Sequence, residues 1–209
     1  MRQAINHLKA NDQRLCKVID CLGDIPFHSH NDPFSFLVGE IVGQMLSNSV
    51  RKVIADRLIK LCGGIITPDT ILEHSADEVK GVGMSASKAY YILNLAEKVK
   101  TKEINFDDFK EFDDNNVIKE LKKIKGIGDW TAKMFLIFYL RRNDVLPFED
   151  GAFLQSYKWL YNTKDTKAES IIKRCKKWKP YSSIGARYMY VALDKGLTKI
   201  PIKDFLSNY

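Results

Sequence analysis

The chain has 209 residues, of which 45% are hydrophobic, and this is enough for one sizeable core, which can be divided between two lobes. The 33 Lys and Arg residues outnumber the 26 Asp and Glu residues, so the net charge is +7. This excess of positive charge favours a polyanionic partner, although charges that serve only to keep the protein soluble would give the same excess. No apolar run is long enough to span a membrane, and the polar N-terminus is not a signal peptide. We therefore expect a soluble, globular chain without a membrane-spanning segment.

Cysteine spacing gives no sign of a metal centre. The four cysteines contain no C-x-x-C pair and no metal-ligand spacing. We expect reduced thiols, no zinc site and no iron–sulfur cluster.

Apolar residues recur with helical spacing along nearly the whole chain. From Phe34 to Met45 they fall at i, i+3, i+4, i+7, i+8 and i+11, which predicts one buried helix face, and the pattern continues to Leu61. Thr67 and Pro68 then form an N-cap followed by a first helical residue. Further helices are predicted at 71–76, 86–100, 116–123, 130–141, 151–159, 167–178 and 183–195. Strand-like alternation is confined to PFHSH, residues 26–30, so the sequence predicts an all-α fold of about ten short helices.

The domain organisation follows from what the chain lacks. No linker rich in Pro or Ser and no low-complexity segment interrupts it. We therefore expect a single domain over residues 1–209 with two helical lobes.

The stretch KGIGDWTAKMF, residues 125–135, predicts a helix-hairpin-helix over about 115–140. Without side chains at Gly126 and Gly128, backbone N–H groups can face a phosphate at the N-terminus of the second helix. Lys125 and Lys133 would add affinity that does not depend on base sequence. A solvated helix face would also carry such lysines, so the glycines are the stronger signal.

A carboxylate follows in DVLPFEDGAF, residues 144–153. Asp150 stands where the N-cap of the next helix belongs, and Asp caps helices well. The same carboxylate could stabilise a developing cation or orient water. Spacing alone leaves both interpretations open.

Four stretches together resemble the helix-hairpin-helix (HhH-GPD) DNA glycosylases, in particular the AlkA-like 3-methyladenine DNA glycosylase II branch. They are LKKIKGIGDWTAKMF, DVLPFEDGAF, FLVGEIVGQMLSNSV and WKPYSSIGARYMYVAL, and they span roughly residues 34–195 in the family's order. The resemblance implies a helical fold whose two lobes flank an active-site cleft. The N-terminal β-rich domain of some members is expected to be absent, because only about thirty residues precede Phe34.

The residue after the hairpin decides which chemistry the resemblance implies. In members that also cleave the strand, a Lys two positions after the final hairpin glycine attacks the sugar. Here that position holds Trp130, and Lys133, three residues further on, is a poor substitute. The resemblance therefore implies a monofunctional enzyme that hydrolyses the base–sugar bond.

The resemblance also assigns roles to individual residues. Asp150 aligns with the catalytic Asp, and Glu149 is the less favoured carboxylate. Met45 aligns with the side chain that fills the gap left by a flipped base, with a place in the helix core as the equally weighted alternative. Trp130 and Tyr190, together with Tyr157 or Trp159 in a wider cage, would recognise a cationic base by stacking. Met134 and Gly151 stand where relatives can have pocket tyrosines, which makes the pocket roomier.

We therefore expect a DNA glycosylase that excises alkylated, 3-methyladenine-like bases in base excision repair. The alternatives are a glycosylase for an oxidised or deaminated base and a non-catalytic DNA-binding protein. The expected partner is double-stranded DNA with damaged bases, bound by a monomer in the cytoplasm, at the nucleoid. No cofactor is expected, apart from a possible monovalent cation held by the hairpin backbone.

Overall fold

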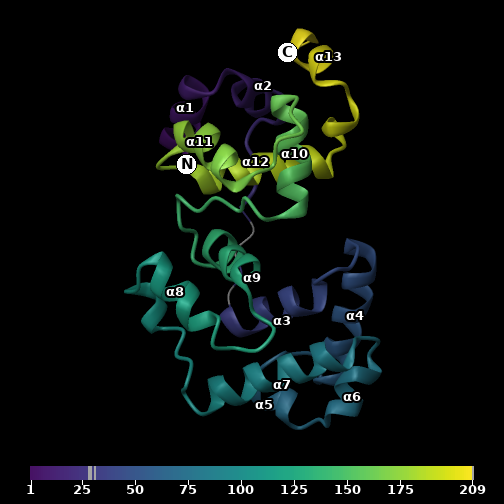
Figure 1. The fold of residues 1–209 in the computed structure, drawn as a ribbon. Coiled ribbons are helices and arrows are strands. Elements are labelled where there is room, and N and C mark those ends of the chain that lie inside the picture. The colour runs from purple at the N-terminus through teal and green to yellow at the C-terminus, as the bar shows by residue number, and fades with distance from the viewer. Residues whose placement is uncertain (28–29, 31, 209) are drawn as a thin grey trace. The chain divides into compact units, whose positions relative to one another are not determined.

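The computed structural model describes residues 1–27, 30 and 32–208, and within these ranges it contains helices and no β-strand (Figure 1). The predicted all-α fold class is confirmed. Residues 28 and 29 of the alternating run PFHSH lie outside the described residues.

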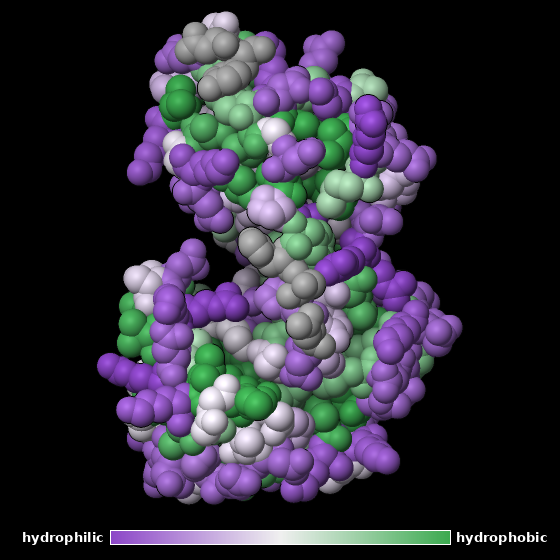
Figure 2. Space-filling model, turned by 180° about the vertical axis from the view of Figure 1, so that it is seen from behind, coloured by the Kyte–Doolittle hydropathy of each residue, from purple (hydrophilic) through white to green (hydrophobic). Residues whose placement is uncertain are grey.

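The chain forms two compact units. Unit 1 comprises Met1–His28 and Arg141–Tyr209, so it is assembled from both ends of the chain, and unit 2 comprises Ser29–Leu140. On the face seen in Figure 2, hydrophilic side chains surround several areas of exposed apolar side chains.

Unit 1 packs its helices around an apolar core, with α10 against α12 and α1 against α2. Trp178, Tyr157 and Tyr188 are among its largest fully buried side chains. Its elements are α1 (Arg2–Asn11), α2 (Gln13–Leu22), α10 (Gly151–Tyr161), α11 (Ala168–Cys175), the 3-10 helix η3 (Lys176–Trp178), α12 (Ser182–Asp194), the 3-10 helix η4 (Leu197–Lys199) and α13 (Ile202–Asn208).

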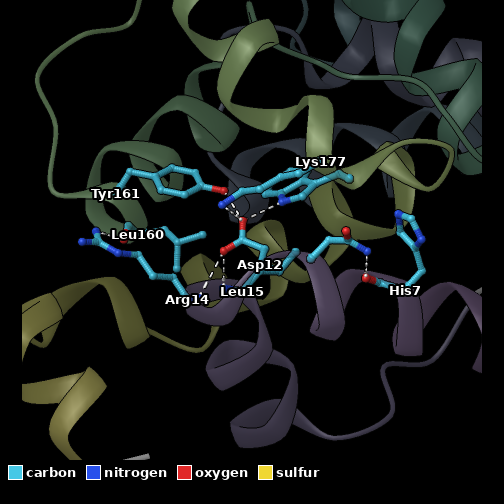
Figure 3. Close-up of polar contacts among 9 residues, drawn as sticks. His7, Asp12, Arg14, Leu15, Leu160, Tyr161 and Lys177 are labelled. Carbon is cyan, nitrogen blue, oxygen red and sulfur yellow. Dashed lines mark hydrogen bonds and ion pairs between the residues drawn. The ribbon is translucent and has the colours of Figure 1, made fainter.

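A buried carboxylate joins distant segments of unit 1 (Figure 3). Asp12 is 1% exposed, caps α2 by accepting from the N–H of Leu15, and accepts from the indole N–H of Trp178 at 2.8 Å and the hydroxyl of Tyr161. Its Oδ2 lies 3.1 Å from Nζ of Lys177. Burial alone would raise the pKa of Asp12, but the bonds from Tyr161 and Trp178, helped by Leu15 and Lys177, outweigh it and hold the pKa below its usual value. Asp12 is therefore a charged group whose hydrogen bonds and ion pair connect α2 to the segments around α10 and η3.

Unit 2 packs α7 against α3, α5 and α6. The buried side of α3 includes Phe34, Leu37 and Ile41, as the apolar spacing predicts. Its elements are α3 (Pro33–Gly43), α4 (Asn48–Leu61), α5 (Pro68–Leu72), α6 (Ala76–Gly81), α7 (Ala86–Lys100), the 3-10 helix η1 (Asp108–Lys110), α8 (Asp114–Leu121), α9 (Asp129–Met134) and the π-helical turn η2 (Phe135–Tyr139).

Some predicted helices are wrong in their bounds. The segment 71–76 is not one helix, because α5 ends at Leu72 and Ser75 caps the new helix α6 in a capping box with Glu78. The helix predicted from Phe34 ends at Gly43. Helices α1, α2 and α13 were not predicted, and the described residues contain thirteen α-helices rather than about ten.

Candidate active site and DNA interface

The helix-hairpin-helix lies within unit 2 and consists of α8, a loop from Lys122 to Gly128, and α9. Gly126 has φ +86°, and a Cβ there would lie 2.1 Å from the ring of Tyr91, so both conformation and space require glycine. Gly128 has φ −104°, is the N-cap of α9, and a Cβ there would meet nothing within 4 Å. The two glycines therefore differ: Gly126 shapes the turn, whereas Gly128 leaves the helix N-terminus open.

Helix α7 supports the loop from inside unit 2. The N–H of Lys125 donates to Oδ1 of Asn94 at 3.4 Å, and its Nζ donates to the hydroxyl of Tyr90 at 3.1 Å. The bond to Tyr90 raises the pKa of the Lys125 ammonium above its usual value. Lys125 is thus a cation of the loop whose side chain is held by Tyr90.

The N-terminus of α9 suits an anion. No side chain caps α9 among the described residues, and the helix continues without a break into η2, so its dipole places partial positive charge at Gly128. Lys122 is paired with Asp129 at 2.9 Å. Because both partners are exposed, this pair contributes little to stability. Lys133, the other predicted phosphate contact, lies on α9 and is half-buried.

Met45 lies in a turn between α3 and α4, Gly43–Ser47, which we call the wedge turn. Its side chain is 101% exposed and its φ is +58°. The alternative that Met45 belongs to the helix core is therefore wrong, because α3 ends two residues earlier. Leu46, Val50 and Val53 are also exposed, and they follow Met45 in the sequence. The wedge turn thus presents an apolar side chain to solvent, and further exposed apolar residues follow it in the sequence.

Two predicted pocket residues lie on α9. Trp130 is half-buried in its first turn, and Met134, four residues later, is 5% exposed. Residues four apart share a helix face, so α9 places the indole and the thioether one above the other. Both belong to unit 2.

Asp150 belongs to unit 1, where it caps α10. Its Oδ1 accepts from the N–H of Phe153 at 2.7 Å, and its side chain is nearly buried, with 8% exposure for the residue. The predicted capping role is confirmed. Glu149, in contrast, is exposed.

The remaining pocket candidates are also in unit 1. Tyr190 is half-buried on α12. Tyr157 is fully buried and stacks on Phe153, so its suggested place in a base cage is wrong, since it belongs to the core. The indole of Trp159 donates to the carbonyl of Ile200 at 2.8 Å, which ties it to the C-terminal segment.

Sequence reasoning missed the residues that support the loop and the wedge turn. They are Gln44, Lys88, Tyr90, Tyr91 and Asn94. Gln44 directly precedes Met45 in the quoted motif and could have been noticed there. The others lie on α7, far from the motif in sequence, and no local pattern marks them.

The described ranges were also searched for metal sites and membrane spans. They hold no cluster of three or more His, Cys, Asp or Glu side chains able to bind a metal ion. None of their helices combines the length and apolar character of a membrane span.

The chain belongs to the HhH-GPD superfamily of base excision DNA repair proteins, whose model matches residues 38–180. Among curated relatives, the alkylbase DNA glycosidase-like protein mag2 of Schizosaccharomyces pombe is 26% identical over 90% of this chain and 92% of its own. DNA-3-methyladenine glycosylase 1 of the same yeast is 26% identical over 88% of this chain and 84% of its own. A solved DNA-3-methyladenine glycosidase from Bacillus halodurans has a TM-score of 0.84 and 31% identity, covering 99% of this chain and 96% of that one. The resemblance to the family and to its 3-methyladenine branch is confirmed.

Proposed function

We propose that the protein is a monofunctional DNA glycosylase that flips an alkylated, 3-methyladenine-like base out of duplex DNA and hydrolyses its bond to the sugar. The observation that carries the proposal is Trp130, which follows Gly128 where a strand-cleaving relative has its lysine nucleophile, in a chain that retains the Asp150 carboxylate. The names of the relatives, alkylbase DNA glycosidase-like protein and DNA-3-methyladenine glycosylase, support the substrate class.

Asp150 is the catalytic group of this proposal. Glycoside cleavage passes through an oxocarbenium-like sugar, which acquires positive charge as the bond breaks. A preformed carboxylate stabilises this charge more in the transition state than in the ground state, and this difference accelerates the reaction. The hydrogen bond from Phe153 fixes the orientation of the carboxylate before substrate arrives.

Trp130, Tyr190 and Met134 are the proposed base-recognition residues. An alkylated purine such as 3-methyladenine is cationic, so it leaves with little acid catalysis and is attracted to an electron-rich aromatic face. Trp130 is half-buried, and its large apolar indole is the kind of side chain on which a base stacks.

The hairpin loop and the wedge turn are the proposed DNA contacts. Backbone N–H groups at Gly126 and Gly128, with Lys125 and Lys133, would bind a phosphate without reading sequence. Met45 would fill the space left by the flipped base, because its exposed thioether is flexible and apolar.

The hairpin backbone is also the proposed place of a monovalent cation. Carbonyl oxygens are the ligands that a hard cation prefers. The carbonyls of Ile124 and Gly126 each accept one hydrogen bond already, from the N–H of Ile127 and the side chain of Gln44, and each retains a second lone pair. Replacing potassium by tetramethylammonium at constant ionic strength should weaken duplex binding if a cation is bound.

A base-release assay tests the proposed function. Duplexes carrying an N-methylated purine, 8-oxoguanine, uracil or hypoxanthine are incubated with the protein, and the released base and strand integrity are followed separately. The proposal predicts release from the methylated duplex with intact strands. Preferential release of an oxidised or deaminated base would replace the substrate class, and tight binding without release from any duplex would indicate a non-catalytic DNA-binding protein.

A further inference from the structure

The backbone at Met45 adopts a conformation that a non-glycine residue rarely takes. Its φ of +58° lies in the left-handed region, where the Cβ approaches the carbonyl oxygen. The side chain is fully exposed, so its own packing does not hold this conformation. Neighbouring groups must hold it.

Lys88 on α7 holds the main chain just before this point. Its Nζ donates to the carbonyl of Val42 at 2.9 Å and to the carbonyl of Gln44 at 2.6 Å. The Gln44 carbonyl belongs to the peptide group that precedes Met45. Within the turn, the N–H of Leu46 donates to the carbonyl of Gly43 at 3.1 Å.

The side chain of Gln44 reaches from the wedge turn to the hairpin. Its Nε2 donates to the carbonyl of Gly126 at 2.9 Å and lies 3.3 Å from Oγ1 of Thr131, in the first turn of α9. These partners are 82 and 87 residues away in sequence. Gly126 is itself fixed by its positive φ and by the Tyr91 ring. Gln44 therefore links the two segments: it directly precedes Met45 in the chain, and its side chain is hydrogen-bonded to the hairpin.

We propose that Gln44 is a positioning residue that couples base displacement to phosphate binding, an inference that rests on the proposed function. The hairpin binds the DNA backbone, and the Gln44 amide fixes where Met45 enters the duplex relative to that phosphate. A preset distance removes conformational freedom that would otherwise be lost when the base is displaced. Both contacts lie within unit 2, so the coupling needs no contribution from unit 1.

The variant Gln44→Met tests this coupling, because methionine has nearly the same length but no amide donor. Single-turnover excision of an N-methylated purine at saturating enzyme should slow by about tenfold when the lesion is paired, the effect of losing roughly one net hydrogen bond. When the same lesion lies opposite an abasic site, Gln44→Met should excise it within threefold of the wild-type rate, since an unpaired base leaves the stack at little cost. Affinity for undamaged duplex should stay within twofold.

Two further variants separate positioning from folding. Met45→Ala should slow paired excision, and Gln44→Met/Met45→Ala should be no slower than Met45→Ala alone, because Gln44 acts through Met45. Lys88→Met removes the hydrogen bonds from Lys88 to the carbonyls of Val42 and Gln44. This variant should likewise slow excision of the paired lesion more than excision of the unpaired lesion. Gln3→Met, at an exposed position on α1, is the matched control and should leave every rate unchanged. Circular dichroism confirms the fold of each variant.

A readout without chemistry keeps the inference separate from the proposed function. A duplex with 2-aminopurine paired to thymine should brighten when the wild-type protein displaces the base from the stack, and Gln44→Met should weaken this rise. If the wild type releases no base from any lesion but shows the Gln44-dependent rise, the proposed function fails and the coupling stands. Equal rates for Gln44→Met and wild type on the paired lesion, an equal loss on paired and unpaired lesions, or multiplicative effects of Gln44→Met and Met45→Ala would each overturn the coupling.

Discussion

The two hairpin glycines offer a test in which one substitution alters the fold and the other alters DNA contact. At Gly126 an added Cβ would lie 2.1, 2.4 and 2.8 Å from three ring atoms of Tyr91, and the φ of +86° is unfavourable for alanine. At Gly128 the φ of −104° suits any residue and the added Cβ meets open space. We therefore expect Gly126→Ala to destabilise the protein and Gly128→Ala to leave its stability unchanged.

The magnitudes follow from these two environments. For Gly126→Ala, the left-handed conformation costs about 1–2 kcal/mol and the overlap with Tyr91 about 1–3 kcal/mol. The sum, roughly 2–5 kcal/mol, should lower the unfolding temperature by about 4–20 °C for a chain of this size. For Gly128→Ala the change in the free energy of unfolding should stay within about 0.5 kcal/mol.

DNA binding, unlike stability, should be affected by Gly128→Ala. Its methyl group would stand where backbone N–H groups meet a phosphate, so affinity should fall equally for damaged and undamaged duplex. The slope of log K against log salt should flatten by about 0.9 for one lost phosphate contact. Scanning calorimetry and fluorescence anisotropy at several salt concentrations measure both quantities. A Gly128→Ala protein that binds both duplexes as tightly as wild type would show that the turn is only a structural corner, and a Gly126→Ala protein as stable as wild type would refute the steric reasoning.

Two further predictions concern stability and strand chemistry. Asp12→Asn should lower the free energy of unfolding by about 2–4 kcal/mol at pH 7, because it removes a buried charge that accepts bonds from Trp178 and Tyr161. The folded pKa of Asp12 lies below its unfolded value of about 3.9. This contribution to stability is therefore present above pH 4 and is lost as the pH falls through the folded pKa. Urea unfolding that shows the same difference between variant and wild type at pH 3 and pH 7 would contradict it. With Trp130 in the place of the lysine nucleophile, product strands should stay intact until hot alkali is added. Trapping of a covalent protein–DNA adduct by borohydride would refute that assignment.

Local sequence signals predicted the elements that depend on interactions between residues close together in the sequence. The helix at 86–100, the Thr67 cap followed by Pro68, and the Asp150 cap are all confirmed. Each depends on apolar spacing or on a capping side chain within a few residues. The helix-hairpin-helix was located for the same reason.

Features that depend on distant contacts could not be predicted in this way. Apolar spacing carried the first helix through Met45, but the chain leaves the helix after Gly43. There Lys88 from α7 donates to the carbonyls of Val42 and Gln44, and the Gln44 side chain donates to the distant carbonyl of Gly126. The assembly of unit 1 from both chain ends likewise leaves no local mark, since the linking segments have ordinary composition. The polar N-terminal segment hid α1 and α2, although Leu8, Leu15 and Val18 are fully buried there.

The most direct test of the account is single-turnover release of a methylated purine by Asp150→Asn, with DNA affinity measured in parallel. Asparagine keeps the shape of the side chain and caps α10 about as well as aspartate does, so fold and lesion binding should be nearly unchanged. Excision should fall by at least about a hundredfold, as is typical when one charge-stabilising group is removed from an active site. An Asp150→Asn protein that releases the base as fast as wild type would contradict the assignment of Asp150 as the catalytic carboxylate.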